Sequence, residues 1–131
     1  LKAARHLVAA DGVRTALRSA LHGVADVERA LSRLALDRGG PRDLAAVRAG
    51  LAQAERVAVL LDDAPALLRD AAAALIGHAA LRDLLERALV ADPPLLARDG
   101  GFVAAGFDPD LDATRRLRDE GRGVIAAMQA E

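Results

Sequence analysis

Hydrophobic residues recur every three or four positions along most of this chain, which is the spacing of helices that bury one face. The segment that begins at Pro41 shows this best, with Leu44, Val47, Leu51 and Leu61 at helical spacing. The pattern and its breaks predict seven helices, over residues 1–10, 11–23, 27–38, 41–61, 66–76, 79–90 and 109–131.

Aspartate, glycine and proline mark the ends of these predicted helices. Asp11 and Asp26 are each expected to cap the helix that follows, because a carboxylate accepts hydrogen bonds from the free N–H groups there. The glycine pair at 39–40 stops the third helix, and Pro41 suits the first turn of the fourth. Two further breaks are a turn at 62–65 and the proline pair at 93–94.

A glycine-rich turn precedes the last helix. It separates two short apolar runs, at 95–96 and 102–103, and therefore indicates a small hairpin. An aspartate followed by Pro109 is typical of a helix start, and the helix from there to the end would be roughly 35 Å long. The residues of this turn are Asp99, Gly100, Gly101, Gly106 and Asp108. The predicted fold is an all-α multi-helix bundle with a short β-hairpin-like turn before a long C-terminal helix.

Composition supports a helical domain that is part of something longer. Hydrophobic residues make up 53% of the 131 residues, but alanine and leucine dominate and only Phe102 and Phe107 are aromatic. The absence of cysteine excludes disulfides and thiolate metal sites, and fits a cytoplasmic location. The longest uncharged run, residues 71–81, is too short to span a bilayer. The chain has no initiator methionine and begins and ends in a helical pattern, so we expect a piece of a larger protein.

The charge balance argues against nucleic-acid binding as the main role of this chain. Eighteen basic residues oppose 19 acidic ones, for a net charge of −1. The densest basic cluster alternates with acidic residues, so pairs such as Asp112–Arg116 and Asp119–Arg122 would give a solvated, self-paired face. Phosphate contact is the alternative, and a weak DNA contact is expected here if anywhere. The cluster consists of Arg115, Arg116, Arg118 and Arg122.

The residues for catalysis, cofactor binding or metal binding do not come together in this sequence. The only lysine, Lys2, follows no glycine-rich loop, so no phosphate-binding Walker A motif is present. Adjacent aspartates at 62–63 favour helix capping over acid–base chemistry, and the acid at 99 makes the glycine turn a poor anion nest. We therefore predict no catalytic, metal or cofactor site. The histidines share no helical pair spacing and are His6, His22 and His78.

Charged residues at two helix starts are predicted to be structural. We hypothesise charge-assisted hydrogen bonds between the two groups, with Arg29 and Asp43 coupled in a double-mutant cycle. The cluster consists of Asp26, Glu28, Arg29, Arg42 and Asp43. A second feature, the glycines at 121 and 123, lowers the helix propensity of the last helix. Close approach of a neighbouring helix is one explanation, and a soft point in the helix is the other.

Two long motifs carry a family resemblance. Residues 98–112 read RDGGFVAAGFDPDLD, and residues 26–51 read DVERALSRLALDRGGPRDLAAVRAGL. Both resemble, in the same order, motifs of the MutS family of bacterial DNA mismatch repair proteins. The chain has Phe107 where the family has tyrosine, Val27 where it has leucine, and Asp110 where it has glutamate.

The resemblance implies a helical core domain over 1–107 and the start of a lever helix over 108–131. In that family the core links an ATPase domain to a clamp that grips DNA, and the intact protein uses ATP and Mg²⁺, dimerises, recognises mismatched duplex DNA and recruits MutL. This piece alone is expected to be neither an enzyme nor a strong DNA binder, and to contact no membrane. The apolar residues Val124, Ile125 and Met128 would lack their normal cover, so self-association or fraying of this helix is expected. The alternative is a free-standing helical interaction module unrelated to DNA repair.

Overall fold

The computed structural model describes all 131 residues as helices joined by short loops, with no sheet. The elements are α1 (Lys2–Ala9), α2 (Asp11–His22), α3 (Val27–Ala35), α4 (Pro41–Leu60), α5 (Ala66–Ala73), α6 (Ala79–Ala88), the short 3-10 helix η1 (Ala97–Asp99) and α7 (Pro109–Ala130). The predicted all-α fold is confirmed. No helix is both long enough and apolar enough to cross a membrane.

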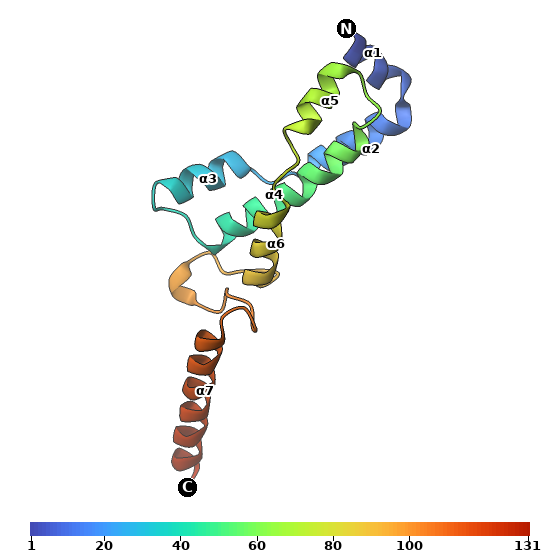
Figure 1. Cartoon of the computed structure of the whole chain (residues 1–131). Helices are drawn as coiled ribbons and strands as arrows, with labels where there is room; N and C mark the ends of the chain where they lie inside the picture. The colour runs from blue at the N-terminus through green and yellow to red at the C-terminus, as the bar shows by residue number, and fades with distance from the viewer.

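The long helix α4 is the axis of an elongated molecule (Figure 1). Helices α1, α2 and α5 lie around its C-terminal end, whereas α3 and α6 lie at its N-terminal end. Helix α7 extends away from the others and is not among the closely packed helix pairs (Figure 1). The fold therefore presents one helix outward from a body that is organised on α4.

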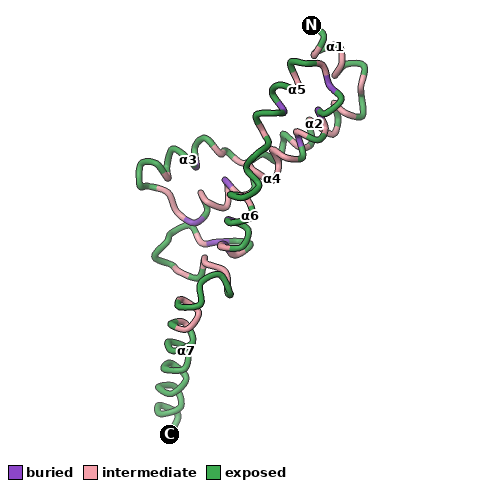
Figure 2. The backbone as a smooth tube through the Cα atoms, viewed as in Figure 1, coloured by how far each residue is buried: buried purple, intermediate pink, exposed green.

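Two small apolar clusters, one at each end of α4, form the core. The first consists of Ala30, Val47, Leu85 and Leu89, and the second of Val57, Leu61, Ala64 and Ala72. Only 11 residues are buried, and the others are exposed or half-buried, as Figure 2 shows. The many short alanine side chains explain how the helices approach closely without large buried side chains.

Close packing and ion pairs hold α3 and α6 on α4. Gly50 of α4 is buried against Val27 of α3. A Cβ at this glycine would clash with the Cγ2 of the valine, so the two helices can pack this closely only with glycine here. On the other side, Arg82 of α6 pairs with Glu55 of α4 as well as with Asp83 beside it. The first core cluster is thus fixed from two directions.

Two of the predicted aspartate caps are present, at Asp26 and at Asp108. The Asp26 carboxylate accepts a hydrogen bond from the backbone N–H of Arg29, as predicted for the cap of α3. The Asp108 carboxylate likewise accepts from two N–H groups at the start of α7. The prediction for Asp11 is wrong, because this residue is already the first of α2 and its side chain pairs with Arg14 instead.

The predicted hairpin is reduced to one antiparallel bridge, and its partner differs from the expected one. Val103 pairs with Leu89 rather than with the run at 95–96. The flanking hydrogen bonds run from the N–H of Val90 to the carbonyl of Phe102 and from the N–H of Ala104 to that of Ala88. The intervening residues, with the proline pair and η1, form a longer loop than a two-residue turn would need.

Candidate functional site

The turn into α7 depends on glycine. Gly100, Gly101 and Gly106 have φ values of 68°, 71° and 85°, a left-handed region that glycine adopts without steric penalty. Asp99 is the last residue of η1, immediately before the first of these glycines. Gly100 and Gly101 thus precede the bridge at Val103, and Gly106 lies between this bridge and the capped start of α7.

Side chains of the first two turns of α7 bond back to this turn. The Asp112 carboxylate accepts a hydrogen bond from the N–H of Gly106 at 2.8 Å. The Arg115 guanidinium donates to the carbonyl of Val103 at 2.9 Å and lies 4.0 Å from the Asp112 carboxylate. We call Val103, Gly106, Asp112 and Arg115 the α7 joint.

Arginines of α4 form further polar contacts with the segment that contains Leu89, the bridge partner of Val103. These contacts were not expected from the sequence. The Arg48 guanidinium, on α4, donates to the carbonyls of Leu89, Val90 and Ala91 at 3.3, 3.1 and 3.0 Å. Arg42, six residues earlier on α4, donates to the carbonyl of Pro93 at 3.2 Å. An arginine at a helix position gives no sign in the sequence that it will bind backbone some 40 residues away.

The predicted polar cluster divides into separate contacts. Asp26 and Arg29 meet only through the helix cap, Glu28 is exposed, and Arg42 is directed to Pro93. Arg29 and Asp43 form no direct hydrogen bond or ion pair, although the charge of Arg29 helps to lower the pKa of Asp43, and their coupling stays a prediction. Helical geometry places a different arginine opposite the acid.

That arginine is Arg33, whose Nε lies 3.3 Å from the Asp43 carboxylate. The same carboxylate accepts from the N–H of Gly40 at 2.8 Å, which is one half of a capping box. The backbone hydrogen bond from Gly40, and secondly the Arg33 guanidinium, lower the pKa of Asp43 below its ordinary value. The charged form of Asp43 thus stabilises the start of α4 and its junction with α3.

We expect Asp43→Ala to lower the free energy of unfolding by about 1 kcal/mol at neutral pH. A group with a lowered folded pKa contributes stability above its unfolded pKa and loses it as the pH falls through the folded pKa. The deficit of the variant should therefore shrink in acid, as measured by urea unfolding monitored by circular dichroism. Asp63→Ala, in an exposed turn, is the control. A double-mutant cycle should give coupling for Arg33 with Asp43; equal coupling for Arg29 would contradict the structure.

The basic face of α7 is partly self-paired, but not through the pairs expected. Arg118 lies 2.9 Å from the Asp119 carboxylate, and this hydrogen bond lowers the pKa of Asp119. The ion-pair partner of Asp112 is Arg115, not Arg116. Arg116 and Arg122 are exposed and have no ion-pair partner within 4.0 Å. Contact of the four arginines with DNA stays a prediction.

The apolar residues at the end of α7 are exposed. Val124, Ile125 and Met128 have exposed fractions of 60, 58 and 71%. No atom lies within 4 Å of a Cβ placed at Gly121 or Gly123, so close approach of a helix of this chain does not explain these glycines.

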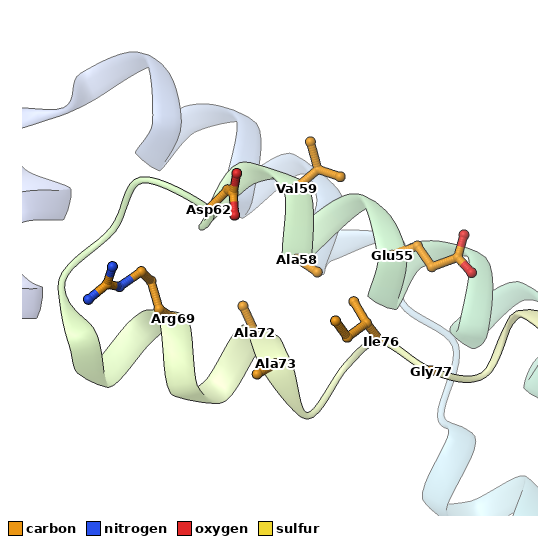
Figure 3. Close-up of a pocket in the computed structure, with 9 residues that line it drawn as sticks. All are labelled: Glu55, Ala58, Val59, Asp62, Arg69, Ala72, Ala73, Ile76 and Gly77. Atoms are coloured by element: carbon orange, nitrogen blue, oxygen red, sulfur yellow. The ribbon is translucent and has the colours of Figure 1, made fainter.

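A shallow groove of about 530 Å³ between α4 and α5 has no catalytic arrangement. Figure 3 shows alanines on its floor and the charged residues Glu55, Asp62 and Arg69 near its rim. Glu55 is already paired with Arg82, and the groove has no histidine, serine or threonine. The aspartates at 62–63 do not cap α5 as expected, because Pro65 occupies the cap position.

Histidines and acids are scattered over the molecule. His6 lies on α1, His22 at the end of α2 and His78 before α6. No group of three or more histidine, aspartate or glutamate side chains is close enough to hold a metal ion. The organised polar contacts of this chain are therefore those that fix its helices and its outgoing helix.

Comparison with known proteins shows the family of this chain. The family model described as MutS domain III matches residues 1–130. The chain belongs to the MutS family.

Three curated relatives, each named DNA mismatch repair protein MutS, are similar over nearly the whole chain. The relative from Cereibacter sphaeroides is 64% identical over 131 residues, which is 99% of this chain and 15% of the relative. Those from Paracoccus denitrificans and Dinoroseobacter shibae are 64% and 62% identical over 98% and 97% of this chain, again 15% of each relative. The chain thus spans about 15% of the length of these MutS proteins, and corresponds to MutS domain III.

Proposed function

We propose that this MutS domain III acts as a stiff helical connector within a longer mismatch repair protein, with α7 as the start of a lever helix. The proposal rests on how α7 is joined to the rest of the molecule. The helix leaves the body at one end, and all its residues from Arg116 onward are exposed. A helix of this kind moves its far end whenever its base is turned.

The partners of the longer protein are part of the same proposal. The name DNA mismatch repair protein MutS, which the relatives bear, supports mismatched duplex DNA as the ligand. A homodimer and MutL enter the proposal as further partners from the family resemblance of the sequence. In this proposal the connector relays the state of an ATPase domain to a DNA clamp, in the bacterial cytoplasm. The chain itself contributes no chemical step.

ATP and Mg²⁺ do not fit the residues of this chain. Its only lysine is Lys2 on α1, far from any glycine-rich loop, and no acidic cluster is suited to a metal ion. We therefore place both ligands on other parts of the longer protein.

The proposal is tested by exchanging domains. This chain would replace the matching region of the Paracoccus denitrificans MutS, in a strain that lacks its own MutS, and the spontaneous mutation rate would be measured. We expect the chimera to restore the low rate of the strain that carries the intact relative. A chimera that accumulates normally yet leaves the rate at that of the MutS-deficient strain would contradict the proposal and favour an unrelated interaction module.

We also propose that the isolated chain self-associates through the end of α7, or that this end frays. The support is the exposed apolar side chains there, which water disfavours. Sedimentation velocity should detect dimers that weaken in Ile125→Asp, while hydrogen exchange reports fraying. A strictly monomeric chain with full protection of the last two turns of α7 would contradict both.

A further inference from the structure

The direction of α7 depends on few contacts. None of its residues is buried, and its half-buried residues all lie in its first two turns. They are Leu111, Asp112, Ala113 and Arg115. Two of these four are charged side chains that bond to the backbone of the preceding turn.

The residue that Arg115 holds is itself held from the other side. Val103 forms the antiparallel bridge with Leu89, and Leu89 is buried in the first core cluster. The carbonyl of Leu89 accepts a hydrogen bond from Arg48 of α4. The bridge thus lies between two arginines, each of which donates to a backbone carbonyl of one bridge residue.

We propose that Arg48 and the α7 joint form one continuous polar connection that sets the angle of α7 relative to α4. Arg48 fixes the strand-like segment 89–91, the bridge fixes Val103 to it, and Arg115 with Asp112 fixes α7 to the segment 103–106. Arg48, Asp112 and Arg115 are therefore positioning residues. None of them needs to contact a ligand for this role.

Hydrogen bonds suit this role because their strength depends on angle as well as on distance. An apolar contact is non-directional, so it tolerates rotation of one helix over another. Arg48 donates to three successive carbonyls, which a planar guanidinium with five N–H groups does better than a lysine ammonium. Asp112 adds a second fixed point, because its carboxylate accepts a hydrogen bond from the N–H of Gly106 at 2.8 Å.

The connection is tested by distance measurements between spin labels. The chain has no native cysteine, so two introduced cysteines are labelled specifically. The pair Ser32→Cys and Glu120→Cys reports the angle of α7, since one residue lies on α3 and the other is an exposed position in the middle of α7, before its apolar end. The pair Ser19→Cys and Ser32→Cys lies within the body and reports its integrity.

We expect a single narrow distance distribution for the α7 pair in the parent chain. Arg115→Leu, Asp112→Ala and Arg48→Leu should each abolish the narrow peak and give a broad distribution, while the body pair keeps its distance. The result for Arg48 is the most telling, because this residue has no hydrogen bond to α7. Arg118→Leu, which removes a pair within α7 alone, is the matched control and should change nothing.

Narrow α7 distributions in Arg115→Leu and Arg48→Leu, with an intact body pair, would overturn the inference. If Arg48→Leu disturbs the body pair, Asp112→Ala decides, because the Asp112 carboxylate has a hydrogen bond to Gly106 and an ion pair with Arg115, and neither partner lies in the body. A narrow α7 distribution in Asp112→Ala would also overturn the inference. This geometry is measured on the chain alone, so its failure is distinguishable from failure of the proposed function, which the chimera tests.

Discussion

Replacing Leu89 by alanine is expected to lower the free energy of unfolding by about 2–5 kcal/mol. Leu89 is buried in the first core cluster with Ala30, Val47 and Leu85. Loss of its side chain leaves a cavity among residues of three helices. Because a domain is stable by only about 5–15 kcal/mol, a loss of this size brings a chain with so small a core near unfolding.

Urea unfolding followed by circular dichroism measures this effect. Leu81→Ala, near the start of α6 and 46% exposed, is the control and should lose far less. The Leu89 variant should also release the bridge to Val103, which shows as faster hydrogen exchange at the N–H groups of Val90 and Ala104. Equal losses in the two leucine variants would contradict the burial of Leu89 in this core cluster.

Gly40→Ala is expected to destabilise the chain by about 1–3 kcal/mol, for a reason unrelated to backbone freedom. The backbone of Gly40 is extended, with φ −134° and ψ −176°, and alanine adopts this conformation readily. A Cβ there, however, would lie 2.5 Å from the carbonyl oxygen of Leu95. This oxygen is a backbone atom, so the segment after the proline pair must move away from the start of α4.

Gly121→Ala is the matched control for this prediction. No atom lies within 4 Å of a Cβ at Gly121, so the variant should gain about 1 kcal/mol of helix stability instead of losing any. Thermal unfolding of both variants measures the difference. A Gly40→Ala variant as stable as the parent would mean that the loop at Leu95 does not rest on α4.

The helices were predictable from sequence because their signals are local. The apolar period of α4, the cap at Asp26 and the proline after Asp108 each act within one turn of helix, and each is where the sequence places it. The left-handed glycines of the turn into α7 are local in the same sense.

The contacts that join the helices were not predictable in the same way. Asp43 has two arginines within reach along α3, and only the packing of α3 on α4 selects Arg33 over Arg29. The partner of Val103 is Leu89 instead of the nearer run at 95–96, because the proline pair and η1 take up the intervening residues. Arg48 offers no sequence signal at all, since its partners are backbone carbonyls.

We infer that a stiff connection from the helical body to α7 relays the state of one part of a MutS protein to another. Stimulation of ATP hydrolysis by mismatched duplex DNA tests this inference, when it is measured in the chimera with and without three glycines inserted after Gly106. We expect the insertion to leave basal hydrolysis and DNA affinity intact but to abolish the stimulation. The same insertion in the exposed turn after Asp62 should leave the stimulation unchanged. Full stimulation with the insertion after Gly106 would contradict this inference.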